Sequence, residues 1–163
     1  MTVADTGGTL RLWDFTSRSP RAVIKAHDGF IFRLAFHPGG KMLASSSIDS
    51  SVRIWEIASG RLLATLKHVG HVYGIAFNPD GTRLATACKD NTIRLWDARH
   101  FEKVAELRGH QGYVHAVAFS ADGTRLVSCS GDLTVRIWDA PKSANTRAST
   151  LGDPPVREAL SNR

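Results

Sequence analysis

The sequence has only two cysteines, Cys88 and Cys129, and neither lies in a Cys-x-x-Cys pair. Each lies in an apolar, strand-like run, which favours two buried reduced thiols over a disulfide or a zinc site. No apolar run approaches the roughly 20 residues of a membrane span. The opening segment MTVADTGGTL lacks the basic start and apolar stretch of a signal peptide. We therefore expect a soluble intracellular protein, cytoplasmic, with the nucleus as the alternative.

Signatures of catalysis and of a strongly basic surface are also missing. The sequence contains no phosphate-binding loop and no dinucleotide fingerprint, so we expect no enzyme activity and no cofactor. Lys and Arg number 21 against 15 Asp and Glu, a net charge of +6, but the positive charges are scattered and form no basic run. This balance permits an acidic partner, a nucleic acid or an anionic surface, and it requires none of them.

What the sequence does contain is a repeat. Four tryptophans, each followed by an acidic residue, recur every 41 or 42 positions: Trp13, Trp55, Trp96 and Trp138. The last three end similar stretches, FIFRLAFHPGGKMLASSSIDSSVRIWE, HVYGIAFNPDGTRLATACKDNTIRLWD and YVHAVAFSADGTRLVSCSGDLTVRIWD. A fixed period of this length is typical of repeat architectures, in which one structural unit stacks on the next.

Each repeat predicts four short strands. The runs FRLAF, YGIAF and HAVAF are followed by the turns HPGG, NPDG and SADG, in which Pro or Asp sets the turn and Gly supplies a positive φ. Second strands (MLASS, RLATAC, RLVSC), Asp-containing turns and alternating third strands (VRIW, IRLW, VRIW) follow. A weaker fourth strand fits RAVIK, RLLATL and EKVAEL. The repeat therefore predicts a four-stranded antiparallel meander.

A period near 40 residues with four strands and a Trp-acidic ending resembles the WD-repeat β-propeller family over residues 1–139. The resemblance implies blades around a central channel, with the Phe-ending strands innermost and the weak fourth strands outermost. The predicted fold is all-β, a partial propeller of about three complete four-stranded antiparallel blades plus a partial N-terminal blade.

The domain boundaries follow from the repeat. Residues 1–25 are expected to form the partial first blade, with two or three strands and Gly7 where the turn Asp should stand. Residues 26–139 hold the three WD-repeat units, and 140–163 are expected to be a polar tail with a short helical turn over 155–163. Three ways to close the ring stay open: a fragment of a longer propeller, which is favoured; self-association of two chains through the open blade edges; or a small four-bladed ring.

Every complete unit contains a His, a hydroxyl residue, an Asp and a Trp at fixed offsets. His27 and His110 each lie 28 positions before their Trp, and the Asp lies 6 before it. In the second unit the segment KHVGHVYG offers two histidines, and the spacing selects His68 and not His71, although His71 follows a Gly. The three sets are His27, Ser45, Asp49 and Trp55; His68, Thr86, Asp90 and Trp96; and His110, Ser128, Asp132 and Trp138.

A Ser-His-Asp set invites a hydrolase interpretation, but here the set recurs three times and no nucleophile elbow is present. We therefore favour a buried hydrogen-bond relay from the Trp indole through the hydroxyl and the imidazole to the carboxylate. Such structural tetrads are also what the family resemblance implies. A zinc site at His68 and His71 lacks a third ligand nearby, so no metal is expected.

Because the strands alternate in direction, the His loops and Asp turns of all blades should lie at one end. Large side chains gather in these loops, and the resemblance implies that this face receives peptides and partner domains of other proteins. The expected contact residues are Phe30, Phe32, Ile48, His71, Tyr73, Lys89, Tyr113 and His115.

Two alternatives to a protein-interaction scaffold stay open. The first is a propeller that binds a nucleic acid or another anionic partner, because Arg53, Arg94 and Arg136 each lie two positions before their Trp. Pairing of these arginines with acidic neighbours is the favoured interpretation. The weaker alternative is a regulatory propeller portion of a larger enzyme.

Overall fold

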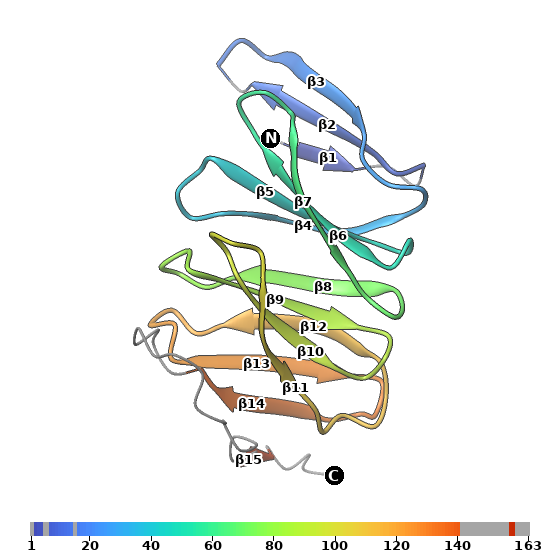
Figure 1. Cartoon of the computed structure of the whole chain (residues 1–163), viewed down its shortest axis with the longest axis vertical. Coiled ribbons are helices and arrows are strands. Elements are labelled where there is room, and N and C mark those ends of the chain that lie inside the picture. The colour runs from blue at the N-terminus through green and yellow to red at the C-terminus, as the bar shows by residue number, and fades with distance from the viewer. Residues whose placement is uncertain (1, 5–6, 15, 141–156, 159–163) are drawn as a thin grey trace.

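The structure is a computed structural model that describes residues 2–4, 7–14, 16–140 and 157–158. Within these ranges every regular element is a β-strand, and the strands form four antiparallel sheets. The sheets follow one another along the long axis of the molecule, from the N-terminal sheet (β1 to β3) at one end to β15 at the other (Figure 1). We call them blades 1 to 4 in chain order.

Blade 1 has three strands in the order β1-β2-β3, and the other blades have four strands each. All four blades are meanders in which each strand pairs with the strand next to it in sequence. The strands of blade 1 are β1 (Thr2–Ala4), β2 (Thr9–Asp14) and β3 (Ser19–Lys25). Those of blade 2 are β4 (Ile31–Phe36), β5 (Met42–Ser47), β6 (Ser51–Glu56) and β7 (Leu62–Lys67). Those of blade 3 are β8 (Val72–Phe77), β9 (Arg83–Cys88), β10 (Ile93–Asp97) and β11 (Lys103–Leu107).

Blade 4 is completed from the C-terminal segment. Its strands are β12 (Val114–Phe119), β13 (Arg125–Ser130), β14 (Val135–Asp139) and β15 (Arg157–Glu158). The prediction of a helical turn over 155–163 is wrong at Arg157 and Glu158, whose backbone pairs with β14. A sheet edge presents unpaired N–H and C=O groups, and β15 satisfies part of this edge. Residues 141–156 and 159–163 of the predicted tail lie outside the described part of the chain.

Glycine enables the turn between the first two strands of each complete blade. Gly40, Gly81 and Gly123 have φ of 68°, 73° and 71°, a left-handed conformation that a β-carbon would strain. The expected PGG, PDG and ADG turns are therefore formed, and they return the chain into β5, β9 and β13.

The strands that end in Phe lie innermost, as the family resemblance implies. β8 contacts β4 on one side and β12 on the other, whereas β7 and β11 form the outer edges of blades 2 and 3. This order confirms the predicted all-β, partial-propeller fold, because the innermost strands of successive blades are neighbours.

Apolar side chains between neighbouring blades form the core. Along each middle strand, alternate residues face opposite neighbours: Leu43 packs toward blade 1, and Ala44 packs toward blade 3. Opposite Ala44 lie Leu84 and Trp96 of blade 3. Burying one such large apolar side chain contributes about 1.5–3 kcal/mol. Blades 3 and 4 repeat the arrangement with Ala85, Ala87, Ile93, Leu107, Val114, Val117, Leu126 and Trp138.

The two end faces of the stack are less covered. In blade 4, Val127 and Val135 are 37% and 43% exposed, whereas their counterparts in blade 3, Ala85 and Ile93, are fully buried. At the other end, Trp13 of blade 1 is 38% exposed, although the three later tryptophans are buried. Apolar side chains are thus partly exposed at each end of the described blades.

Close approach of β8 to β12 depends on Gly74. A β-carbon there would lie 2.9 Å from the Cα atom of Ala116 and 3.0 Å from the carbonyl oxygen of His115. We predict that Gly74→Ala pushes these strands apart and lowers the free energy of unfolding by about 1–3 kcal/mol. Urea denaturation measures this change. Val69→Ala is the control, since Val69 is 86% exposed, and an unchanged midpoint for Gly74→Ala contradicts the close approach.

Candidate functional site

Blade 2 contains an uninterrupted relay of hydrogen bonds. The indole Nε1 of Trp55 donates to Ser45 Oγ over 2.9 Å. Ser45 Oγ lies 2.7 Å from Nε2 of His27, and Nδ1 of His27 lies 2.9 Å from Asp49 Oδ2. His27 and Ser45 are fully buried. The relay joins β5 and β6 to the loop that leads into β4.

Blade 4 repeats the relay. Trp138 Nε1 donates to Ser128 Oγ, Ser128 Oγ lies against Nε2 of His110, and Nδ1 of His110 lies against Asp132 Oδ2, each over 2.8 Å. Burial alone would raise the pKa of Asp132. Hydrogen bonds from the Thr134 hydroxyl, the Gln111 N–H and His110 more than offset this and hold the pKa below its usual range.

The directions of these hydrogen bonds follow from the donor inventory. An indole N–H only donates, so the hydroxyl oxygen accepts from it, and the hydroxyl O–H donates a hydrogen bond to His Nε2. The imidazole therefore carries its proton on Nδ1 and donates to the carboxylate. Because every donor is matched, no member is free to act as a nucleophile or a base. Burial lowers the pKa of His27, which keeps its imidazole neutral.

Blade 3 departs from this pattern at its carboxylate. Trp96 Nε1 donates to Thr86 Oγ1 over 3.0 Å, and Thr86 Oγ1 lies 2.9 Å from Nε2 of His68, so the spacing and not the Gly-His pair identifies the relay histidine. However, Nδ1 of His68 faces the carbonyl oxygen of Leu66 at 3.1 Å. The expected bond from His68 to Asp90 is replaced, and Arg94 Nη2 donates to Asp90 Oδ2 over 2.6 Å.

A shorter linker accounts for part of this correction. β7 ends at Lys67, directly before His68, whereas Ala26 separates the end of β3 from His27. In blade 2, Arg53 Nη1 donates to the carbonyl oxygen of that extra residue over 2.7 Å. Blade 3 has no residue in this position, so Arg94 needs other acceptors.

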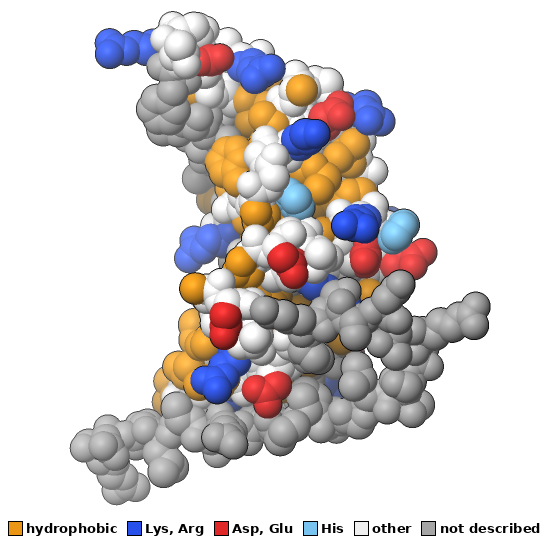
Figure 2. Space-filling model, turned by 90° about the vertical axis from the view of Figure 1, so that its left-hand side faces the viewer, with side chains coloured by type: hydrophobic (Ala, Val, Ile, Leu, Met, Phe, Trp, Pro, Cys, Tyr) orange, Lys and Arg blue, Asp and Glu red, His pale blue; other side chains and the backbone are white. Residues whose placement is uncertain are grey.

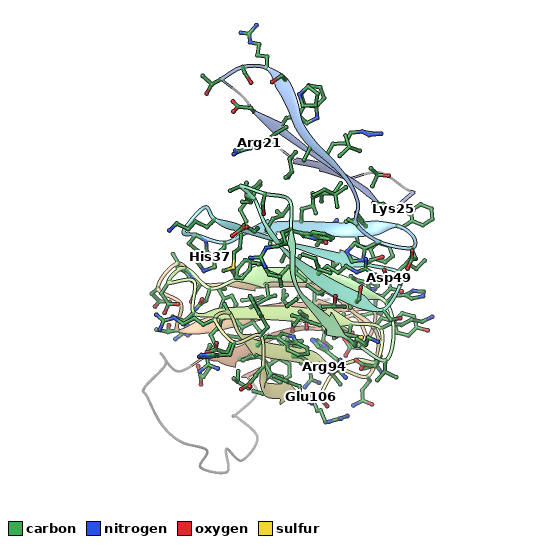
Figure 3. The ribbon with its side chains drawn as sticks, turned by 45° about the horizontal axis from the view of Figure 1, so that its top comes forward. Arg21, Lys25, His37, Asp49, Arg94 and Glu106 are labelled. Carbon is green, nitrogen blue, oxygen red and sulfur yellow. The ribbon has the colours of Figure 1, made fainter. Side chains whose placement is uncertain are left out.

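Those acceptors are acidic. Arg94 lies opposite Glu106 in the ladder between β10 and β11, whereas Arg53 lies opposite Thr65 in blade 2. The Nε of Arg94 is 3.2 Å from Glu106 Oε2, and the two side chains lie close together in Figure 3. Arg94 is thus held between Asp90 and Glu106. Sequence reasoning did not identify Glu106 as a partner of Arg94. The signal was an acidic residue in the weak fourth strand EKVAEL, which lies next to the strand of Arg94.

The altered partners shift two pKa values. Burial, together with the nearby Arg94 charge, lowers the pKa of His68 to about 4, because the Leu66 carbonyl offers less to an imidazolium than a carboxylate does. Burial opposes ionisation of Asp90, but its hydrogen bonds from Arg94 and Thr92 lower its pKa to about 2. At neutral pH, His68 is uncharged and Asp90 is ionised.

The predicted contact residues come together at the same end of the blades, and five of them form what we call the aromatic cluster: Phe32, His71, Tyr73, Tyr113 and His115. Tyr73 is its centre. The ring centroid of Tyr73 is 5.0 Å from Phe32, 6.0 Å from His71, 6.4 Å from Tyr113 and 5.5 Å from His115. The cluster therefore crosses blades 2, 3 and 4.

The other predicted contact residues border this cluster. Phe30 is 49% exposed and its carbonyl oxygen accepts the N–H of Ile48. Lys89 places Nζ 5.3 Å from the ring centroid of Tyr113, which is itself 47% exposed. In Figure 3, Asp49 marks this end of blade 2, and His37 marks the opposite end with the Pro/Gly turns.

In the part of the chain that the structure describes, no group of three or more His, Cys, Asp or Glu side chains is arranged to hold a metal ion. Among the described residues, no helix is long and apolar enough to cross a membrane.

The repeats of this chain match a known protein family. The family model described as "WD domain, G-beta repeat" matches residues 18–56, 60–97 and 101–139. The chain belongs to the WD-repeat family. Each matched WD repeat begins at the outer strand of one blade and ends after the third strand of the next.

Individual relatives match over shorter stretches. "Nuclear distribution protein PAC1-2" of Uncinocarpus reesii is 43% identical over 36% of this chain and 13% of its own length. "DDB1- and CUL4-associated factor 13" of Dictyostelium discoideum is 36% identical over 31% of this chain and 11% of its own length. "Nuclear distribution protein nudF" of Emericella nidulans is 39% identical over 36% and 13%. The matched part of this WD-repeat chain thus spans only about an eighth of each relative.

The partner of Asp90 can be tested by a double substitution. We predict that Asp90→Ala lowers the free energy of unfolding by about 1.5–3 kcal/mol, because it leaves a buried charge short of its acceptor. Adding Arg94→Met should recover part of this loss, since no unpaired buried charge then remains. Thermal melts measure both. Lys41→Met in the same background is the control, because Lys41 is exposed at the opposite end of the blades. No recovery with Arg94→Met would assign Asp90 to another partner.

The neutral state of His68 makes stability depend on pH. In the unfolded chain the pKa of this imidazole is its ordinary 6.5, whereas burial in the folded chain lowers the pKa to about 4. Stability from this group is therefore full above about pH 6.5 and is lost as the pH falls toward 4. We predict that His68→Asn shows a smaller drop in Tm between about pH 7 and pH 5 than the wild type. His100→Asn, at an exposed turn, should keep the wild-type slope, and an equal slope in His68→Asn would contradict this assignment.

Proposed function

We propose that this WD-repeat chain is a non-enzymatic interaction scaffold that receives a peptide or a domain of another protein on the aromatic cluster. The observation that carries the proposal is the continuity of this cluster over three blades, with Tyr73 in contact with rings from both neighbouring blades. WD-repeat domains as a family bind other proteins, and this supports the same role here.

The surface beside the cluster suits a side chain of a partner. An open hollow of about 350 Å³ lies next to His71 and Tyr113. Its other lining residues are Ser50, Val69, Gly70, Lys89 and Asp90. Aromatic residues dominate the energetics of protein interfaces, because they bury a large area at a small entropic cost.

Three features speak against catalysis and support the scaffold. The Ser-His-Asp sets recur, they are buried, and their donors are matched within each relay. WD-repeat proteins are generally not enzymes. Two of the three arginines considered for an anionic partner pair with acids: Arg53 Nη2 lies 3.8 Å from Asp49, and Arg94 pairs with Asp90 and Glu106. These pairs favour a protein partner over a nucleic acid.

The two cysteines agree with a reducing compartment. Cys88 and Cys129 are both free thiols, and burial raises the pKa of Cys88, which keeps it protonated and unreactive. We therefore propose a cytoplasmic location for the scaffold, with the nucleus as the alternative.

Partner capture tests this function. The triple variant Phe30→Ala, His71→Ala and Tyr113→Ala removes side chains at the surface and leaves the three relays intact. We predict that it captures at most about a tenth of the partner protein taken by the wild type, since loss of an interface hot spot costs about 2 kcal/mol or more. The melting temperature should change little.

A matched triple variant at the opposite end is the control: Lys41→Ala, Asp80→Ala and Asp122→Ala should capture as much partner as the wild type. Quantitative pulldown from the native source with mass spectrometry measures capture. Retention of every specific partner by the aromatic triple variant would remove the cluster from the interaction surface.

A further inference from the structure

We propose that the segment bound at the aromatic cluster is acidic: a peptide that sets an apolar side chain on the rings and a neighbouring carboxylate beside Lys89. This inference rests on the proposed function and adds the chemistry of the partner. At this end of the blades most carboxylates already have partners within the chain, whereas the ammonium group of Lys89 has no acidic partner among the described residues.

Lys89 is the cation best placed for such a carboxylate. Its Nζ lies over the ring of Tyr113, and the Lys89 side chain lines the hollow that His71 and Tyr113 also line. Its backbone N–H donates to the carbonyl oxygen of His71 over 2.8 Å, which fixes the turn. Within the described ranges the ammonium group has no ion pair. Lys89 is therefore a positive charge held at the cluster by a ring and not neutralised by an acid.

A second positive charge lies at the other side of the cluster. Arg33 is exposed, and its Nη1 donates to the carbonyl oxygen of Phe32 over 3.0 Å. A carbonyl does not neutralise a guanidinium, so Arg33 adds to the positive potential next to Phe32. An extended peptide that crosses the cluster would meet a cation on each side.

The acidic side chains at this end are largely engaged. Asp49 and Asp132 accept from the relay histidines, and Asp90 accepts from Arg94. Asp28, in the loop before β4, is exposed and lies 4.0 Å from Arg53. The corresponding positions in the next two blades are the uncharged Val69 and Gln111, so no ring of free carboxylates opposes an acidic partner.

The opposite end of the blades differs in charge. There, acidic and basic side chains lie scattered among apolar ones over the visible surface (Figure 2). Such a mixed surface has no preferred sign of partner, whereas unpaired cations beside aromatic rings favour a carboxylate next to an apolar group.

Aromatic clusters also bind cations, so a basic peptide is the competing occupant. Here the ring of Tyr113 already has an ammonium group over it. A second cation at the same ring would be repelled by Lys89 without gaining a free aromatic face. The charges therefore favour the acidic peptide, and the basic peptide becomes an outcome of the test.

The experiment uses the full chain and three short fluorescein-labelled peptides. The first alternates Glu and Trp between flexible Gly ends, and its twins carry Gln or Lys in place of Glu. By fluorescence anisotropy we expect the acidic probe to bind about tenfold more tightly than the Gln twin. Lys89→Met keeps the apolar stem on Tyr113 and should reduce this preference to about twofold or less. Lys41→Met, at the opposite end, should preserve it, and added NaCl should weaken the preference in the wild type.

Equal binding of the acidic probe and its Gln twin overturns the acidic-partner inference, as does tighter binding of the Lys twin, an unchanged preference in Lys89→Met, or no binding of any probe to folded wild type. None of these results bears on capture of the native partner by the aromatic cluster. The pulldown with the aromatic triple variant decides that question independently, so failure of the two proposals can be distinguished.

Discussion

Apolar contact between neighbouring sheets is the constraint on which the molecule depends. Residues that alternate along β5 and β9 face opposite neighbours, so each blade between two others is buried on both sides. Because Gly74 has no β-carbon, the backbone of β8 can lie directly against the backbone of β12. This contact also sets the distances between Phe32, Tyr73 and His115, because the inner strands that carry or adjoin them meet only when the sheets are stacked. The interaction surface is therefore a product of the core and not of any single loop.

The buried relays fix each blade internally. A hydroxyl on the second strand accepts from the Trp on the third and donates to the His that precedes the first, so one oxygen holds three parts of a blade in register. Blade 3 shows how much variation this tolerates. When the linker is one residue shorter, the carbonyl oxygen of Leu66 accepts the hydrogen bond from His68 Nδ1, and the Asp90 carboxylate pairs with Arg94 instead. The relay atoms and the Asp90 carboxylate keep hydrogen-bond partners, but a neutral carbonyl replaces a carboxylate next to His68, and burial with the nearby Arg94 charge lowers the pKa of His68 to about 4.

Sequence reasoning reached the fold and most of the relay geometry because both follow from a fixed period. The 28-residue spacing to Trp96 selected His68 over His71, and Thr86 holds His68 in the structure. The role of Asp90 was not predictable from its own repeat, because the acid that helps to hold Arg94 is Glu106 on a different strand. Tyr73 was included among the contact residues, but its central place depends on the curvature that brings three blades together. Pairing of Arg157 with β14 could not be predicted from the sequence, since a strand of two residues is too short to show an alternation of apolar and polar side chains.

The matched repeats do not coincide with the blades. The repeat over 60–97 supplies the outer edge of blade 2 and the three inner strands of blade 3, so covalent and spatial units are offset by one strand. Each blade is thus connected to its neighbour covalently, within one repeat, as well as by packing of side chains. A duplicated gene segment one repeat long would supply the outer strand of one blade and the three inner strands of the next. An array can therefore grow by whole repeats without leaving a blade incomplete, whereas an insertion of part of a repeat would leave a blade without some of its strands.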